Sequence, residues 1–153
     1  MNVMPQSLVK NYLHITYSTK NREPLISVDI EKELHNYLAE ICNNHECHPI
    51  KIGGYDDHVH VVCSLSRKIA LMSLIEHLKT SSSKWIKTKD LRLKDFYWQG
   101  GYSAVSVNPA DLQRLIEYVE NQREHHKKTT YKQELIAFLV KNGIPYDERY
   151  LWD

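Results

Sequence analysis

The order of its strand-like and helix-like segments constrains the fold of this 153-residue chain more than any other feature. Four segments are rich in the β-branched and aromatic residues that favour strands: 12–19, 49–55, 58–65 and part of 95–108. Two segments carry apolar residues at helical spacing: 30–44 and 70–88. The order β-α-β-β-α-β predicts a split βαβ arrangement, in which the helices pack on an antiparallel sheet.

We therefore expect an α+β, ferredoxin-like fold, with an antiparallel sheet, helices on one face and extra C-terminal helices. The other face of such a sheet would be free to carry a functional site. The length corresponds to one ordinary domain, so residues 1–153 are expected to form a single domain.

Two further helices are predicted in the C-terminal third of the chain. Residues 109–127 predict a helix that Pro109 opens at its first turn, with Asn108 as its cap. Residues 131–142 predict a shorter helix that stops at Gly143. The tail that follows is aromatic, so we expect it to dock on the body of the protein.

Composition excludes several classes of protein. No run of about 18 apolar residues is present, so we expect no membrane span. The first residues lack the basic and long apolar regions of a secretory signal. The three cysteines have no framework spacing, which indicates free thiols and a cytoplasmic protein: Cys42, Cys47 and Cys63.

Basic residues are concentrated between residues 67 and 94, although the whole chain has a net charge of only +1. Eight Lys or Arg stand there against two acidic residues, which suggests a surface for a phosphate backbone. The candidate DNA-binding residues are Arg67, Lys68, Lys79, Lys84 and Lys87. Three aromatic residues are candidates to stack on unpaired bases: Trp85, Tyr97 and Trp98. A solvated helix face and core packing remain the alternatives.

The segment "HVHVV" places two histidines on one face of a strand. His58 and His60 are two residues apart, so their side chains point the same way, roughly 7 Å apart. Val59 and Val61 then face the opposite side, toward the expected helices. Two neutral imidazoles on one face form a pair of metal ligands. The alternative is a pair of hydrogen-bonded histidines on a solvated sheet face.

The predicted helix 109–127 carries a second pair of candidate residues. Tyr118 and Gln122 are one turn apart at the edge of its apolar stripe, so they face the same point. His125 continues the row and is a candidate acid or base. The alternative is that Tyr118 is a core-edge aromatic residue and Gln122 a surface amide.

The histidine strand followed by a Tyr-x-x-x-Gln helix resembles the one-tyrosine HUH transposases of bacterial insertion sequences, the IS200-like family. Five segments in order carry the resemblance: "YSTKNREPL", "IGGYDDHVHVVCSL", "FYWQGGYSAVSV", "LIEYVENQREHH" and "GIPYDERYL". The resemblance implies that Tyr118 is the nucleophile and that three residues hold a divalent metal: His58, His60 and Gln122. It also implies a homodimer whose tyrosine helix completes the partner's site.

The implied activity is cutting and rejoining single-stranded DNA with hairpin ends through a 5′-phosphotyrosine. Imidazole ligands alone favour softer ions such as Zn²⁺, Mn²⁺, Co²⁺ or Ni²⁺ over Mg²⁺. The resemblance implies Mg²⁺ or Mn²⁺, so Mn²⁺ is compatible with both arguments.

Three alternatives to this interpretation remain open. A metal hydrolase with His-x-His-x-His would need a third histidine where Val62 stands. A zinc site is conceivable within "CNNHECH", whose four candidate ligands are Cys42, His45, Cys47 and His48, although their crowding suits tetrahedral zinc poorly. A non-catalytic protein that binds single-stranded DNA or RNA hairpins on the same fold is the third.

Overall fold

The computed structural model describes residues 4–153, so residues 1–3 of the expected 1–153 domain lie outside the description. Its sheet is antiparallel and has the strand order β2-β3-β1-β4. The strands are β1 (Tyr12–Ser18), β2 (His48–Gly54), β3 (His58–Ser64) and β4 (Ser103–Ser106). The α-helices are α1 (Val28–Asn44), α2 (Leu71–Lys89), α3 (Leu112–Glu120), α4 (Gln122–His125) and α5 (Tyr131–Lys141). The predicted α+β fold with C-terminal helices is confirmed.

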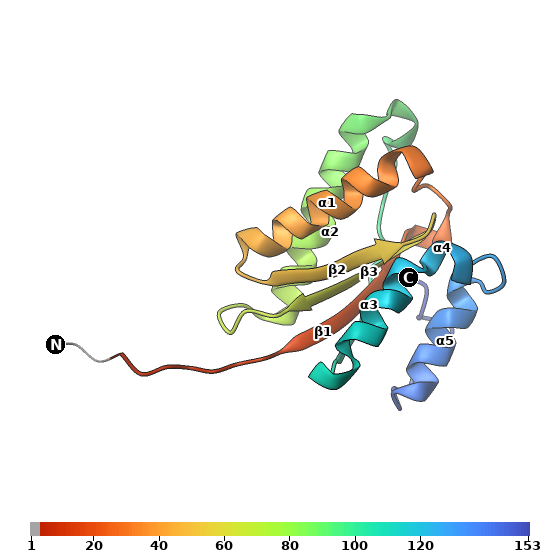
Figure 1. Cartoon of the computed structure of the whole chain (residues 1–153). Helices are drawn as coiled ribbons and strands as arrows, with labels where there is room; N and C mark the ends of the chain where they lie inside the picture. The colour runs from red at the N-terminus through yellow and green to blue at the C-terminus, as the bar shows by residue number, and fades with distance from the viewer. Residues whose placement is uncertain (1–3) are drawn as a thin grey trace.

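Helices α1 and α2 cover one face of the sheet and enclose an apolar core (Figure 1). Alternate residues of β1 and β3 point into it, because successive side chains of a strand face opposite sides. Val59 and Val61 are fully buried there, as predicted. They pack in one cluster with Leu34 of α1 and Leu78 of α2, which are also fully buried.

The opposite face of the sheet is covered by α3, α4 and α5 (Figure 1). The expectation of a free face was therefore wrong. Tyr131 at the start of α5 has its hydroxyl 3.0 Å from Thr16 Oγ1 on β1. Two further apolar residues of α5, Leu135 and Leu139, form a small second core with Tyr131. Packing against the sheet removes this apolar stripe of α5 from solvent, which stabilises the helix in this position.

The predicted helix 109–127 is interrupted. A 3₁₀ turn at Pro109–Asp111 comes first, and the Asn108 side chain caps it by accepting from the Ala110 N–H, as expected. Helix α3 then ends at Glu120; Asn121 follows with a non-helical φ of −95° and ψ of 20°, and α4 begins at Gln122. Hydrogen bonds from residue i to residue i−4 continue on both sides of the break, from Asn121 N–H to the Glu117 carbonyl and from His125 N–H to the Asn121 carbonyl.

The C-terminal tail docks as predicted. Leu151 and Trp152 pack against the cluster on α5, and the carbonyl of Asp153 accepts from Gly101 N–H at 2.9 Å. The fourth strand lies within residues 95–108 as predicted, and Trp98 in the segment before it is buried in the core. Within residues 4–153, no helix has the length and apolar character needed to cross a membrane.

Candidate active site

The two histidines of β3 are buried side by side between the sheet and the C-terminal helices. The Nδ1 atom of each ring lies within hydrogen-bond distance of another side chain. His58 Nδ1 lies 2.7 Å from Asp57 Oδ1, and His60 Nδ1 lies 2.8 Å from His14 Nε2. Burial lowers the pKa of His14 to about 3, so this ring is neutral at pH 7 and can accept from His60. Both histidines therefore present Nε2 to the interior of the site, as metal-binding histidines commonly do.

Gln122 joins the histidines from the first residue of α4. Its side chain is buried, and Oε1 lies 2.8 Å from His58 Nε2. Its amide N–H donates to Glu134 Oε2 at 2.9 Å, which fixes the orientation of the amide. The structure thus brings together the three residues that the resemblance implied as metal ligands. Their role as ligands stays a prediction.

Tyr118 reaches the same site from α3. Its ring meets the ring of His60 edge-on, with the centroids 5.9 Å apart, and its hydroxyl donates to Glu134 Oε2. Burial and the neighbouring Glu134 carboxylate raise the pKa of Tyr118, so the phenol is neutral at pH 7. The phenol and the imidazoles meet within one chain here, whereas the resemblance implied that the tyrosine helix completes the partner's site.

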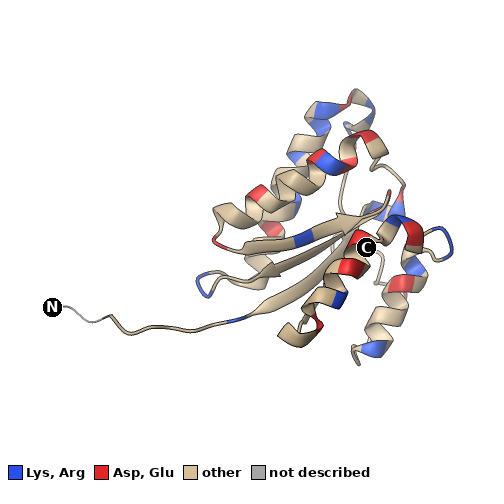
Figure 2. Cartoon of the chain, in the orientation of Figure 1, with Lys and Arg blue, Asp and Glu red and all other residues tan. Residues whose placement is uncertain are grey.

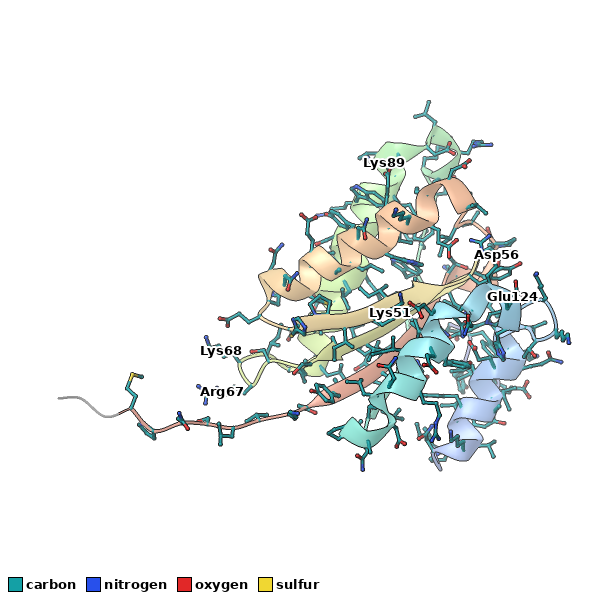
Figure 3. All side chains as sticks on the ribbon, viewed as in Figure 1. Lys51, Asp56, Arg67, Lys68, Lys89 and Glu124 are labelled. Atoms are coloured by element: carbon teal, nitrogen blue, oxygen red, sulfur yellow. The ribbon has the colours of Figure 1, made fainter. Side chains whose placement is uncertain are left out.

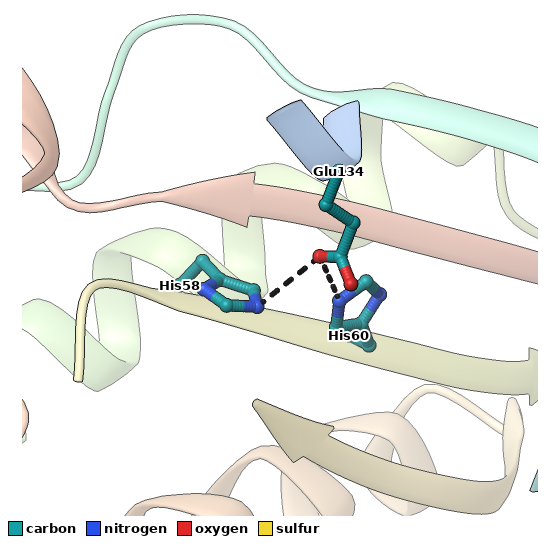
Figure 4. Close-up of side chains that lie close together, drawn as sticks. All are labelled: His58, His60 and Glu134. Atoms are coloured by element: carbon teal, nitrogen blue, oxygen red, sulfur yellow. Dashed lines mark hydrogen bonds and ion pairs between the residues drawn. The ribbon is translucent and has the colours of Figure 1, made fainter. Parts of the chain in front are cut away.

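Glu134 of α5 is a site residue that the sequence reasoning missed. Its Oε1 lies 2.9 Å from His60 Nε2 and 3.4 Å from His58 Nε2 (Figure 4). Burial alone would raise the pKa of Glu134, but hydrogen bonds from His126 and His60 outweigh it and lower the pKa. One signal was available, because a carboxylate stands on the apolar stripe of the predicted helix 131–142.

Two adjacent histidines close the site on the side of α4. His125 Nε2 lies 3.1 Å from Glu134 Oε2, and its ring is 5.4 Å from that of Tyr118. His126, which was not singled out, has Nε2 2.8 Å from Gln122 Oε1. Burial lowers the pKa of His126, but its hydrogen bond to Glu134 outweighs this and the net pKa is raised. His125 lies beside Tyr118, the position that an acid or base for the phenol would need. That role stays a prediction.

The donor set fits a divalent metal. Within residues 4–153, two groups of histidine and carboxylate side chains have ligand atoms within 4.8 Å of one another. They share one carboxylate and are His58, His60 and Glu134, and His125, His126 and Glu134. Neither involves the candidate zinc ligands of residues 42–48. In that segment Cys42 and Cys47 are buried in the core, whereas His48 is exposed.

The basic residues between 67 and 94 lie before, along and after α2, with Arg67 and Lys68 at one end of this helix and Lys89 at the other (Figures 2 and 3). Arg67 and Lys68 precede the helix, and Lys68 pairs with Glu46. Lys84 is exposed in the second half of α2. DNA binding by these residues stays a prediction.

Two further candidates, Lys79 and Lys87, also have partners within the chain. Lys79 donates to the backbone carbonyls of Gln99 and Gly101, both at 2.7 Å, and burial lowers its pKa to about 8. Lys87 has its ammonium 4.4 Å from the ring centre of the exposed Tyr97. Lys79 thus holds the segment before β4 in place, whereas Lys87 and Tyr97 form an accessible cation–aromatic pair.

An open hollow of about 560 Å³ lies beside Tyr118. The residues that line it come from α3, α4 and the loop before α5: Tyr118, Asn121, Glu124, His125, Lys127, Lys128 and Thr129. The tyrosine is therefore accessible from outside, on a side that carries two lysines.

The chain matches the family described as IS200-like transposases over residues 7–122. It belongs to this family. A relative, the ISDra2 transposase TnpA of Deinococcus radiodurans, is 22% identical over 116 residues, which cover 72% of this chain and 83% of the relative. The resemblance to IS200-like transposases that was seen in the sequence is thus confirmed. The same matches support a DNA-binding transposase of the insertion-sequence type.

Two solved structures share the fold of this transposase. A crystal structure of a transposase from Deinococcus radiodurans R1 has a TM-score of 0.61 and 18% identity, covering 80% of this chain and 98% of the other. A REP-associated tyrosine transposase bound to a REP hairpin has a TM-score of 0.60 and 15% identity, covering 82% and 74%. The family match ends at Gln122, so His125, His126 and Glu134 lie beyond it.

Proposed function

We propose that this transposase cuts and rejoins single-stranded DNA at insertion-sequence ends through a 5′-phosphotyrosine on Tyr118. The observation that carries the proposal is the meeting of Tyr118 with His58, His60 and Gln122 from three separate elements of one chain. A site that only binds DNA needs no partly buried phenol hydrogen-bonded to a carboxylate beside two oriented imidazoles.

The proposed reaction exchanges one phosphoester for another. The phenol oxygen of Tyr118 attacks the scissile phosphorus and loses its proton, while the bond to the 3′ oxygen breaks and that oxygen gains a proton. The 5′ phosphate stays on the tyrosine. A 3′ hydroxyl of a second DNA end then attacks this phosphate and releases the phenol. The covalent intermediate conserves the bond, so no nucleotide triphosphate is consumed.

A divalent metal, Mg²⁺ or Mn²⁺, is the proposed cofactor, with one ion per site. His58, His60 and Gln122 would hold it, because both imidazole Nε2 atoms approach the same Glu134 oxygen and Gln122 Oε1 lies 2.8 Å from His58 Nε2. Such an ion polarises a phosphate oxygen and neutralises charge that develops in the transition state. Asp57 and His14 would keep both imidazoles in the tautomer that leaves Nε2 free.

Single-stranded DNA with hairpin ends is the proposed substrate. The hollow beside Tyr118 offers Lys127 and Lys128 for phosphates, and the solved relative named as bound to a REP hairpin supports the choice of a hairpin. Lys87 and Tyr97 offer charge and stacking farther away. Arg67 and Lys68 with Lys79 and Lys84 complete the proposed set of DNA contacts.

The test uses hairpin-bearing single-stranded DNA from the flanks of the coding region, with Mn²⁺. Wild type is expected to give a protein–DNA band that survives denaturant. Tyr118→Phe removes only the phenol oxygen and is expected to give no such band, while the exposed Tyr146→Phe serves as the matched control. Equal adduct from Tyr118→Phe and wild type would show that the nucleophile is another residue. Hairpin binding without any cleavage by wild type would favour a passive binder.

The proposed homodimer with composite sites has its own test. In the structure Tyr118 lies in the site of its own chain, so exchange would require α3 and α4 to leave this position. Mixing Tyr118→Phe with a His58→Phe variant distinguishes the two arrangements. Recovered cleavage would indicate that a tyrosine from one chain acts in the partner's histidine site.

A further inference from the structure

We propose that Glu134 is a fourth ligand of the divalent metal and that the same carboxylate positions the Tyr118 hydroxyl. The inference rests on the proposed function, because it takes the histidine site to be a metal site. It adds α5, an element outside the region that matches the family, to the working parts of the transposase.

The distances suit a shared ion. Neighbouring ligand atoms around a six-coordinate ion with bonds of about 2.1 Å stand about 3 Å apart. Glu134 Oε1 lies 2.9 Å from His60 Nε2 and 3.4 Å from His58 Nε2. Gln122 Oε1 lies 2.8 Å from His58 Nε2. Oε1 of Glu134 is thus as well placed beside the two imidazoles as the amide oxygen of Gln122 is beside one.

The two carboxylate oxygens have different neighbours. Oε1 faces the imidazoles, whereas Oε2 accepts from the Tyr118 hydroxyl and from the Gln122 amide at 2.9 Å. A carboxylate held in this way fixes the phenol oxygen at a constant position relative to the ion. Glu134 therefore acts on the metal directly and on the nucleophile by positioning it.

Burial makes an incidental role for this carboxylate difficult to explain. Within residues 4–153, Glu134 is the only acidic residue in the buried class, and it is 7% exposed. Burying a carboxylate is costly unless it is hydrogen-bonded or binds a metal. Tyr131 and Leu135 on the same helix are buried against neighbouring groups and hold the side chain at this depth. A helix that served only to cover the sheet would be more stable with an apolar residue here.

The ligand chemistry follows from the carboxylate. With two imidazoles and one amide alone, the site would favour softer ions, whereas an anionic oxygen shifts the preference toward Mn²⁺ and Mg²⁺. Four protein ligands on a six-coordinate ion would leave two positions for phosphate oxygens. The inference thus accounts for an ion choice that two histidines alone do not favour.

The experiment measures Mn²⁺ binding by calorimetry in the full chain without DNA. Glu134→Gln keeps the shape and removes the charge, and Glu117→Gln removes one charge from the exposed surface of α3 as the matched control. We expect Glu134→Gln to weaken Mn²⁺ binding by at least the about 10–100-fold seen for outer-shell partners of metal sites. The control is expected to bind as wild type does. Binding should recover in part with Glu134→Asp, which keeps the carboxylate.

A spectroscopic measurement separates a ligand from a structural residue. The visible absorption of bound Co²⁺ depends on its ligands, so Glu134→Gln is expected to change the spectrum, with circular dichroism confirming the fold. Wild-type affinity and an unchanged spectrum in Glu134→Gln would overturn the inference, as would tighter Mn²⁺ binding, which would mean that the carboxylate competes for the site. Loss of binding in His58→Phe would leave the proposed metal site standing in that case. No Mn²⁺ binding by wild type would overturn both.

Discussion

The two faces of the sheet differ in the polarity of their buried side chains, although strands β1 and β3 contribute residues to both. The face under α1 and α2 is apolar, with Val59, Val61 and Leu34 fully buried. The face under α3, α4 and α5 is equally buried, but its strand residues include His58 and His60. Alternation along a strand lets a single segment serve both faces, so one face can supply stability while the other supplies chemistry.

The polar face is folded at a cost that the apolar face does not carry. His14, His60 and Glu134 are buried together, and burying polar groups is unfavourable unless each finds a partner. The partners form one connected network, in which Glu134 contacts both a strand histidine and the helix tyrosine. Substitutions on the two faces should therefore separate activity from stability.

The largest expected effect is on the polar face. His58→Phe keeps a ring to stack on Tyr131, whose centroid is 4.2 Å away, but removes both ring nitrogens. We expect DNA cleavage to fall by about 1000-fold or more, because a catalytic metal supplies several kcal/mol of transition-state stabilisation. The midpoint temperature of thermal unfolding should change by only a few degrees. A variant that still cleaves at the wild-type rate would place the chemistry elsewhere.

A core substitution on the apolar face should do the reverse. Leu34→Ala empties space around a fully buried side chain of α1, so the free energy of unfolding should drop by about 2–5 kcal/mol. Mn²⁺ affinity, measured well below the melting temperature, should match wild type because no residue of the site is touched. Urea denaturation measures the change in the free energy of unfolding, and calorimetry measures the Mn²⁺ affinity. If metal affinity fell with stability, the division between the faces would be wrong.

A smaller effect is expected for the group behind His60. His14→Phe keeps the ring volume but removes the acceptor 2.8 Å from His60 Nδ1. Outer-shell partners of metal-bound histidines commonly contribute about 10–100-fold in metal affinity, so Mn²⁺ binding should weaken by that amount. His14→Gln, which retains an acceptor, should recover part of it. An unchanged affinity in His14→Phe would show that this hydrogen bond does not orient His60.

The smallest effect concerns pH and a histidine of α1. Burial, together with Lys51 and His58, lowers the pKa of His35 from 6.5 to about 4. Between these values the unfolded chain binds more protons at this position, so stability should fall as the pH falls through that window. The slope from one group cannot exceed about 1.4 kcal/mol per pH unit. His35→Leu should flatten the decline, whereas His48→Gln, at an exposed position, should not; equal slopes would refute the assignment.

Local patterns in the sequence predicted much of this architecture. Period-two alternation placed Val59 and His60 on opposite faces, and one helical turn placed Gln122 beside Tyr118. The Asn108 cap and the docking of the tail followed from equally local signals. Each of these features depends on residues close in sequence or on a single repeating geometry.

The features that sequence reasoning missed depend on distant contacts. Glu134 and His60 are 74 residues apart, and no local pattern states which face of the sheet a C-terminal helix will cover. The break at Asn121 was also missed, because no proline or glycine marks it in the sequence. The role of Lys79 is similar, because charge counts along a sequence do not report that backbone carbonyls accept hydrogen bonds from its ammonium.

The most direct measurement of the central claim is mass spectrometry of the covalent product. Wild-type protein is incubated with Mn²⁺ and hairpin single-stranded DNA, then digested with nuclease and protease. We expect one peptide to carry the added nucleotide phosphate, with the modification on Tyr118. Modification of another tyrosine, such as Tyr55 or Tyr131, or a product cleaved without any protein adduct, would contradict the account.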